Sequence, residues 1–451
     1  MNEKKIEKRW IVAFVITAIV AVTGLFWEHK TINGSNADFN ATDTISYADV
    51  AWLLTAACLV LLMTPGLSFF YGGMVGKKNV ISTMLKSFIC LGVISILWVA
   101  VGFSLSFGDP IGPTINGVHY GIIGNPADFA FFDYVDQHPH SAMASTIPFV
   151  LFALFQMKFA VITPALITGA LAERIRFISF LLFICLFSIF IYAPLCHMVW
   201  HPDGLLGAYF GVKDFAGGTV VHMSAGFAAL AGVMVLGKRK NLEHIPTNIP
   251  FVLLGTGLLW FGWFGFNAGS ALAANSTAAM AFATTTIASA SAMLTWAFFD
   301  RINGRKVSAL GCCIGAVVGL VAITPAAGFV SIPKSIFFGF IAAIVSNLMV
   351  NWKRLKRIDD TLDVFACHGV GGIMGMILTA IFAEVEGGSL LYGGWEVFGH
   401  HMMALILVAA FSFFGALLLY KITNLFIPLR VSEESEAMGL DMSQHNESIG
   451  L

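Results

Sequence analysis

The chain has 451 residues, of which 57% are apolar and only 11% carry a charge, and its mean hydropathy is +0.82. Soluble globular chains carry about 25% charged residues, so this composition predicts a membrane protein and excludes a soluble enzyme. The formal net charge of -1 argues against nucleic acid or another polyanion as a partner, because such partners require a basic surplus.

Apolar runs long enough to cross a bilayer follow one another along the chain, each near the roughly 20 helical residues that a hydrocarbon core requires. Eleven runs predict eleven spanning helices, near residues 47–73, 79–107, 146–171, 177–199, 215–236, 249–270, 276–299, 307–324, 335–352, 364–383 and 397–427. An additional run at 10–27 follows a basic start, as a secretory signal peptide or a signal anchor does. The sequence leaves its cleavage open, and residues 1–46 are expected to hold this segment and a polar outer linker.

Basic residues mark alternate loops between these runs, and cytoplasmic loops are the ones that hold Lys and Arg in excess. They fall at 77–78, 174–176, 238–240, 301–306 and 353–357, whereas the opposite loops hold essentially Lys213 and Lys334. This pattern predicts a membrane domain over 47–427 and a cytoplasmic tail over 428–451. The tail is polar, which is typical of a disordered, solvated end but also fits a regulatory contact.

Two histidines lie at bilayer depth, where an ionisable side chain is a functional candidate by default. His222 follows Asp214 by eight residues, and His368 follows Asp360 by eight. This echo between the fifth and tenth runs predicts a 5+5 inverted repeat plus a final helix, with the site at the repeat interface. Recurring glycines at 311, 315 and 319, and at 371 and 375, indicate close helix crossings.

A pair of imidazoles in contact can take up and pass on a proton near physiological pH. The alternative is that each histidine is an ordinary core residue that bridges helices. A metal site is the weakest interpretation, because two histidines without nearby cysteine or carboxylate ligands leave it incomplete. Asp214 precedes the fifth run directly, so it can serve as an N-cap, act on a cation, or do both.

Aromatic side chains give a second signal, because ring faces attract a desolvated cation by up to about 2 kcal/mol. Phe155 and Phe159 are one turn apart in the third run, Trp200 ends the fourth, and Ser270 ends a motif that holds Trp263 and Phe266. A serine hydroxyl can accept a hydrogen bond from a cation rich in N–H donors. Rings in membrane helices are more often core residues or interface anchors, which is the alternative.

These residues fall in long motifs that resemble the ammonium transporter (Amt/Mep/Rh) family, and the resemblance extends from about residue 47 to 445. The motifs are PGLSFFYGG (65–73), GALAERIR (169–176), DFAGGTVVH (214–222), GWFGFNAGS (262–270), DVFACHGV (363–370) and GLDMSQH (439–445). The resemblance implies eleven helices per subunit, a homotrimer with one pore per subunit, ammonium as substrate and no cofactor.

The resemblance also implies roles for single residues. An outer recruitment site would consist of Trp200, Phe155 and Ser270, and Phe159 with Phe266 would form an aromatic gate below it. His222 and His368 would be the twin histidines of the pore, and Trp263 and Tyr71 would line it. Asp214 would support the recruitment site. Trp200 and Ser270 together indicate the Amt/Mep branch, whose prokaryotic members commonly bind a PII signalling protein at the inner face.

Two features depart from the family pattern. Lys158 lies beside Phe159, where the family is usually apolar, and a positive charge near a cation site would oppose recruitment. Helical spacing turns Lys158 about 100° from Phe159, which predicts that it faces elsewhere. The leading segment is the second departure. The main rival to transport is an ammonium sensor that signals through the tail or a partner.

Overall fold

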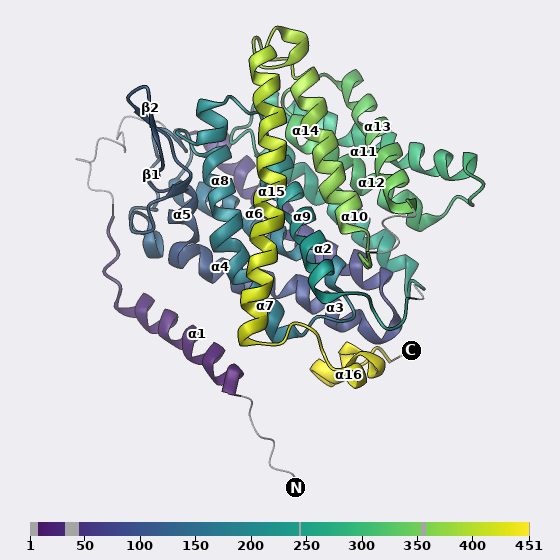
Figure 1. The fold of residues 1–451 in the computed structure, drawn as a ribbon. Helices are drawn as coiled ribbons and strands as arrows, with labels where there is room; N and C mark the ends of the chain where they lie inside the picture. The colour runs from purple at the N-terminus through teal and green to yellow at the C-terminus, as the bar shows by residue number, and fades with distance from the viewer. Residues whose placement is uncertain (1–7, 32–44, 243–244, 353–357, 451) are drawn as a thin grey trace.

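The computed structural model describes residues 8–31, 45–242, 245–352 and 358–450 (Figure 1). The basic residues at positions 4 and 5, most of the proposed outer linker and the basic loop 353–357 lie outside the described residues. The described part is predominantly helical, and twelve of its helical stretches are long and apolar enough to cross a membrane. The prediction of an all-α polytopic protein is confirmed.

Eleven of these stretches match the predicted runs, and the twelfth is α1 (Lys8–Phe26). The first repeat consists of α2 (Tyr47–Met74), η1 to α5 (Lys77–Phe107), α6 (Phe149–Leu171), α7 and α8 (Phe177–Phe187, Ala193–Trp200), and η6 with α9 (Gly218–Met223, Ser224–Leu236). The second consists of α10 (Ile249–Gly269), α11 (Ser276–Ile302), α12 (Ala309–Ile323), α13 (Ile332–Asn351), and η9 with α14 (Phe365–Val370, Gly371–Phe382). The long α15 (Trp395–Phe426) follows.

Short elements complete the described chain. Within the second span, α3, α4 and α5 cover Val80–Phe88, Cys90–Leu97 and Phe103–Phe107, with the π-helical turn η2 (Trp98–Gly102) between the last two. Two small hairpins lie in the loop that follows. In the first, β1 (Pro110–Ile111) pairs with β4 (Ile123–Gly124), and in the second, β2 (Thr114–Ile115) pairs with β3 (Val118–His119), both antiparallel. The tail holds α16 (Glu433–Met438) and η11 (Asp441–His445).

Glycines bring the helices together at the predicted places. A Cβ added at Gly319 would lie 2.5 Å from the carbonyl oxygen of Ala288 in α11, and one at Gly375 would lie 2.4 Å from the carbonyl oxygen of Ala322. The first helices of the two repeats also meet closely, since a Cβ at Gly255 of α10 would lie 2.3 Å from a backbone nitrogen of α2. Close approach of this kind allows backbones to pack without a hydrophobic driving force in lipid.

The tail is docked on the membrane domain, which resolves whether it is a free, solvated end. The two Asp441 carboxylate oxygens accept hydrogen bonds from the backbone N–H groups of Ile81 and Ser82 at 3.1 and 2.7 Å, so the tail caps the start of α3. Arg430 donates to the carbonyl oxygen of Leu236 at 2.8 Å, and Arg176 donates to that of Pro428 at 3.2 Å. The tail therefore lies on the face that carries the basic loops.

Candidate functional site

The segment that carries His222 begins at a well-capped helix start. One oxygen of Asp214 accepts hydrogen bonds from the N–H groups of Gly217 and Gly218 at 2.8 and 2.7 Å, and the other accepts from the N–H and hydroxyl of Thr219. Gly217 has φ +119°, a left-handed conformation that glycine adopts without strain. The π-helical turn η6 follows and positions His222 inside the protein, where it is 1% exposed.

The segment that carries His368 has the same layout. Asp360 precedes η9, and one of its oxygens accepts a hydrogen bond from the N–H of Phe365 at 2.7 Å. The other oxygen is buried and has no hydrogen-bond partner among the described residues. Three residues after Asp360, Asp363 adopts φ +56°, the position that Gly217 holds in the first repeat.

Glycines join the two segments. A Cβ at Gly226, four residues after His222, would lie 2.3 Å from the backbone nitrogen of Gly369. A Cβ at Gly372, four residues after His368, would lie 3.2 Å from the Cβ of His222. Each histidine segment thus packs against the other repeat at the same register, and this packing brings the two imidazoles together.

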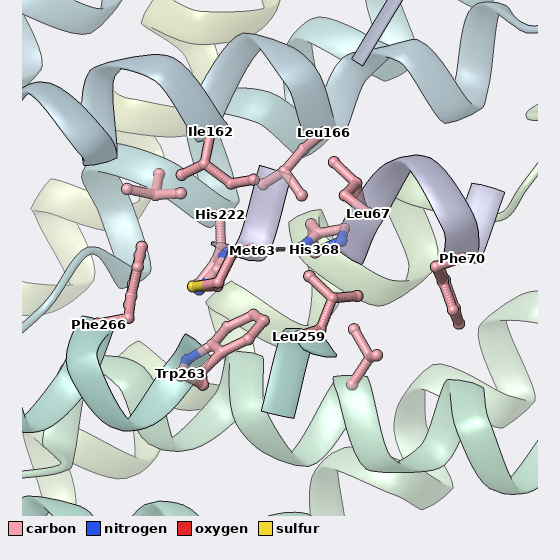
Figure 2. Close-up of a pocket in the computed structure, with 12 residues that line it drawn as sticks. Met63, Leu67, Phe70, Ile162, Leu166, His222, Leu259, Trp263, Phe266 and His368 are labelled. Atoms are coloured by element: carbon pink, nitrogen blue, oxygen red, sulfur yellow. Dashed lines mark hydrogen bonds between the residues drawn. The ribbon is translucent and has the colours of Figure 1, made fainter. Parts of the chain in front are cut away.

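The Nδ1 atoms of His222 and His368 lie 3.4 Å apart, and the ring centroids are 5.4 Å apart (Figure 2). Both side chains are almost completely buried. The pairing predicted from the matched spacing is therefore present in the structure, and the two imidazoles can share one hydrogen.

Thr324, at the end of α12, controls the other nitrogen of His222. Its hydroxyl donates to the carbonyl oxygen of Leu320 at 2.8 Å and accepts from the Trp263 indole N–H at 2.9 Å. His222 Nε2 lies 3.4 Å from the same hydroxyl oxygen, a long contact. Because the only hydroxyl hydrogen is already used, Nε2 must carry a hydrogen to bond there. This assigns Nδ1 of His222 as the acceptor and Nδ1–H of His368 as the donor.

A narrow cavity of about 10 Å³ surrounds the histidine pair. That is close to the least volume that holds one water molecule. In Figure 2 the two histidines lie between Phe266 at one end and Phe70 at the other. Apolar or aromatic side chains complete the wall, namely Met63, Leu67, Ile162, Leu166, Val221, Leu259, Trp263 and Val317. A hydrated ion does not fit such a passage.

Tyr71 is buried beside this passage rather than in its wall. Its hydroxyl donates to the carbonyl oxygen of Leu166 at 3.0 Å, and its ring lies against Gly169, where an added Cβ would be 2.7 Å away. Among the described wall residues it is the preceding Phe70 that faces the cavity. The sequence predicted Tyr71 as a pore-lining residue, whereas in the structure the neighbouring Phe70 lines the histidine cavity.

Two phenylalanine rings separate the histidine cavity from a second cavity, which we call the outer cavity because the basic loops predict that its side faces away from the cytoplasm. The centroids of Phe159 and Phe266 are 4.2 Å apart, with 30° between the ring planes. Phe266 lines the histidine cavity, whereas Phe159 lines the outer cavity, of about 200 Å³. The pair predicted as a gate therefore stands between two cavities.

The outer cavity holds Trp200 and Ser270 in its wall, together with Ala142, Met143, Phe152, Gln156, Phe159, Pro202, Phe215 and Leu272. The Trp200 indole donates to the carbonyl oxygen of Asp214 at 3.0 Å, and its ring meets that of Phe159 edge to face at 5.7 Å. The Ser270 hydroxyl donates to the carbonyl oxygen of Phe266 at 2.9 Å, so its lone pairs remain available.

Phe155 does not occupy its predicted place. Among the described residues the cavity wall includes Phe159 but not Phe155, which is completely buried behind Phe159 with 5.0 Å between ring centroids. A Cβ at Gly269 would lie 2.8 Å from the Phe155 ring. The correction follows from helix rotation, because the cavity face of α6 passes through Phe152, Gln156 and Phe159.

Lys158 is partly buried on α6 and is not among the described wall residues of the outer cavity. It lies two residues from Gln156, which a helix turns about 200° away. Lys158 therefore does not line the outer cavity, as its helical spacing predicts. Both carboxylate oxygens of Asp214 accept hydrogen bonds that cap η6, as the N-cap interpretation predicts.

A third cavity, of about 210 Å³, lies beside an ion-pair network, and we call it the inner mouth because the basic loops predict that its side is cytoplasmic. Arg239 contacts Asp359 and Glu173 at 2.8 and 2.9 Å. Asp360 and Asp363 line this cavity as well. Burial raises the pKa of Asp360 to about 6, and burial together with the nearby Asp360 carboxylate raises the pKa of Asp363 to about 8.

Sequence reasoning missed Thr324 and Gln156. A signal existed for Gln156, which is a polar residue inside an apolar run between the two phenylalanines. Thr324 precedes Pro325 at the end of a helix, where a threonine is unremarkable, and its contacts with His222 and Trp263 span 102 and 61 residues. Such distant contacts leave no mark in the local sequence.

Comparison with known proteins decides the family. The sequence model of the Ammonium Transporter Family matches residues 51–449. The chain belongs to the ammonium transporter family. This is a family of transporters, and several of the motifs that carry the resemblance contribute residues to the histidine pair and to the cavities beside it, among them His222, His368 and Ser270.

Several relatives of this transporter are similar over almost their whole length. A putative ammonium transporter of Methanothermobacter thermautotrophicus is 42% identical over 90% of this chain and 98% of its own. The ammonium transporter Amt1 of Archaeoglobus fulgidus is 41% identical over 89% and 99%. Among solved structures, Candida albicans Mep2 has a TM-score of 0.79 at 34% identity, covering 87% of this chain and 88% of that one. A sensor Amt protein has a TM-score of 0.79 at 31% identity, covering 88% and 98%.

Proposed function

We propose that this protein carries ammonium across the plasma membrane by binding NH4+ at the outer cavity and passing NH3 and the proton through the membrane separately. The observation that carries the proposal is the order of the parts. An aromatic and hydroxyl-lined cavity, a pair of stacked rings and a one-molecule passage with two histidines follow one another between the outer and inner mouths.

Recruitment rests on Trp200, Phe159 and Ser270. The two rings offer faces that attract a cation as it loses water, by up to about 2 kcal/mol. The Ser270 oxygen accepts one of the four ammonium N–H groups, since its own hydrogen is donated to Phe266. Asp214 supports this site indirectly, by its negative charge and by its hydrogen bonds. Its carboxylate caps η6, and its carbonyl oxygen accepts the hydrogen bond of the Trp200 indole.

The energetics favour loss of a proton before the passage. A bare cation in an apolar environment costs several kcal/mol even after relaxation, whereas neutral ammonia costs little. NH4+ therefore divides into NH3, which enters past Phe159 and Phe266, and H+, which travels along His222 and His368 and rejoins NH3 inside. Potassium has no proton to lose, so a pathway that requires deprotonation excludes it whatever its ionic radius.

The assembly and setting belong to the same proposal. We place residues 47–427 in the plasma (inner) membrane as a homotrimer with one pore per subunit, and residues 428–451 in the cytoplasm. Methylammonium is expected as an alternative substrate. A PII signalling protein is the proposed partner at the inner face, where the tail and the basic loops lie together.

The proposal is tested by recording current and lumen pH after an ammonium jump on proteoliposomes. Wild type should give a saturable current, and a His222→Ala/His368→Ala variant should lose it or lose its exclusion of potassium. His119→Ala, in an outer hairpin, is the matched control and should behave as wild type. Lumen alkalinisation without current would contradict separate proton passage and leave neutral ammonia conduction.

A sensor is the second candidate, and the docked tail favours it. The tail contacts the starts of α3 and α7 and the end of α9, so a change in the membrane domain can reach it. The structural neighbour described as a sensor Amt protein has a similar fold. A well-folded protein that gives neither current nor alkalinisation, but changes the protease sensitivity of residues 428–451 on ammonium addition, would support this function instead of transport.

A further inference from the structure

Gln156 lies on the cavity face of α6. Phe152, Gln156 and Phe159 follow the spacing i, i+4 and i+7 of one helix face, and all three line the outer cavity. The Gln156 amide makes no hydrogen bond to another described residue, although it is partly buried. A partly buried amide without a protein partner leaves both its carbonyl and its NH2 group available to a molecule in the cavity.

The hydrogens of the other polar side chains in this wall are already donated to backbone carbonyl oxygens. The Trp200 N–H is donated to Asp214, and the Ser270 hydrogen is donated to Phe266, so the wall offers a cation one hydroxyl oxygen and ring faces. Among the described wall residues, Gln156 alone has a side-chain carbonyl. An ammonium ion has four N–H donors. Each N–H group that loses its hydrogen bond to water without gaining one in the cavity weakens the binding of ammonium.

We propose that the Gln156 side-chain oxygen is a second hydrogen-bond acceptor for ammonium in the outer cavity, alongside the Ser270 oxygen. This proposal rests on the proposed transport function and assigns a further binding residue to the same site. Gln156 acts before the rings of Phe159 and Phe266, so it sets the concentration at which the site fills and not the rate of passage.

The experiment compares concentration dependence of the ammonium current in wild type, Gln156→Met and Gln156→Glu. Met has similar length without polar acceptors, and its half-saturating concentration should rise about tenfold, the equivalent of one hydrogen bond, with the maximal current within about twofold. Glu keeps the acceptor and should not raise the half-saturating concentration. Lys158→Met, on the same helix but outside the described cavity wall, is the control and should not raise it either.

The outcomes separate the two proposals. A wild-type protein without any ammonium response would overturn the transport function itself. A normal wild-type response with an unchanged half-saturating concentration in Gln156→Met would overturn the role of Gln156 alone. A lower maximal current at unchanged half-saturation would overturn it too, since the residue would then shape the passage.

A separate observation concerns the segment that follows α1. The Asp133 side chain is almost completely buried in the outer loop, and one oxygen accepts from the Trp27 indole N–H at 3.0 Å and from the Lys30 backbone N–H at 3.1 Å. The other oxygen lies 3.5 Å from the Lys30 ammonium group. The Trp27 ring stacks on Phe131 at 4.8 Å between centroids.

The other end of α1 lies beside the start of α7, on the side of the protein that carries the basic loops. The rings of Trp10 and Phe177 are 6.2 Å apart, and Phe177 starts α7 directly after a basic loop. The apolar side chains of α1 are exposed along its length, as suits a helix in contact with lipid, and Figure 1 shows α1 set apart from the helical body.

The geometry points to α1 as a retained twelfth spanning helix that Trp27 and Lys30 fasten to Asp133. Cleavage after α1 would separate Trp27 and Lys30 from the membrane-spanning helix. Their contacts with the buried Asp133 carboxylate would then be weakened. The intact mass of purified protein should include residues 8–30, and loss of roughly the first 25 to 45 residues would overturn retention.

Fastening is tested separately by Trp27→Phe, which keeps an aromatic ring but removes the N–H donor. Its thermal unfolding temperature in detergent should fall below that of wild type. Trp10→Phe is the matched control, because the Trp10 indole makes no hydrogen bond to another described residue. Equal unfolding temperatures for wild type and both variants would overturn the fastening.

Discussion

The His222 segment and the His368 segment have one layout and two different surroundings. In each, an aspartate lies eight residues before the histidine, a residue with positive φ lies three residues after the aspartate, and a glycine four residues after the histidine meets the other repeat. On the outer side both carboxylate oxygens are fully used and the left-handed residue is Gly217. On the inner side one oxygen of Asp360 has no described partner and the left-handed residue is Asp363.

The difference teaches that repeat symmetry determines backbone geometry but not chemical role. The outer aspartate serves as a cap of η6 beside the cavity where we propose that ammonium is recruited. The inner pair, Asp360 and Asp363, lines the cavity of about 210 Å³ with carboxyl groups whose pKa values burial raises to about 6 and about 8. Proton exchange near neutral pH is thus available at the inner mouth, where we propose that ammonia regains its proton.

The largest expected effect separates the two aspartates. Asp214→Asn replaces a carboxylate that accepts several N–H donors by an amide that offers one acceptor, so it should destabilise the protein by about 3 kcal/mol or prevent folding. Asp360→Asn should cost about 1 kcal/mol, because one oxygen has no described partner. Thermal unfolding in detergent compares them, and equal losses would contradict the contrast.

The second effect concerns the left-handed positions. Gly217→Ala should cost about 2 kcal/mol, because an L-residue is strained there and its Cβ would lie 2.7 Å from a Val221 methyl group. Asp363→Gly relieves strain and should change stability by less than about 1 kcal/mol. The same unfolding measurement applies, and a destabilised Asp363→Gly with a neutral Gly217→Ala would reverse the comparison.

A third effect tests the link between Thr324 and His222, which has no counterpart among the described contacts of His368. Thr324→Val leaves the buried Trp263 N–H without its acceptor and should cost about 1–3 kcal/mol. It should also shift the pH dependence of the current, because the His222 tautomer is no longer selected. Thr379→Val, which removes a hydroxyl that bonds only within α14, is the control for stability and should leave the pH profile unchanged.

The smallest effect is a slope of stability against pH. Folding raises the pKa of the Asp363 carboxyl, so this group favours the folded state while it is protonated. Its contribution to stability is complete below about pH 4 and is lost as the pH rises toward 8. Asp363→Asn should therefore have a flatter unfolding profile between pH 5 and about 8 than wild type. A slope that persists unchanged in the variant would assign it to other groups.

The sequence predicts the spans well because hydrocarbon permits only long apolar helices with internal backbone hydrogen bonds. It also predicts the contact between His222 and His368, since their equal spacing from an aspartate reveals the repeat. It misplaces Phe155, because one turn of helix separates a residue in the cavity wall from one behind it. It does not predict whether the tail is solvated or docked, because a polar segment has the same composition in either case.

The tail contact has a consequence for the order of assembly. The N–H groups at the start of α3 find their acceptors in Asp441, 359 and 360 residues further along the chain. During synthesis the first repeat must therefore enter the membrane with this helix start uncapped by the tail, until Asp441 has left the ribosome. A chain truncated between α15 and Asp441 therefore retains every described spanning helix and lacks the contact that joins the first repeat to the tail.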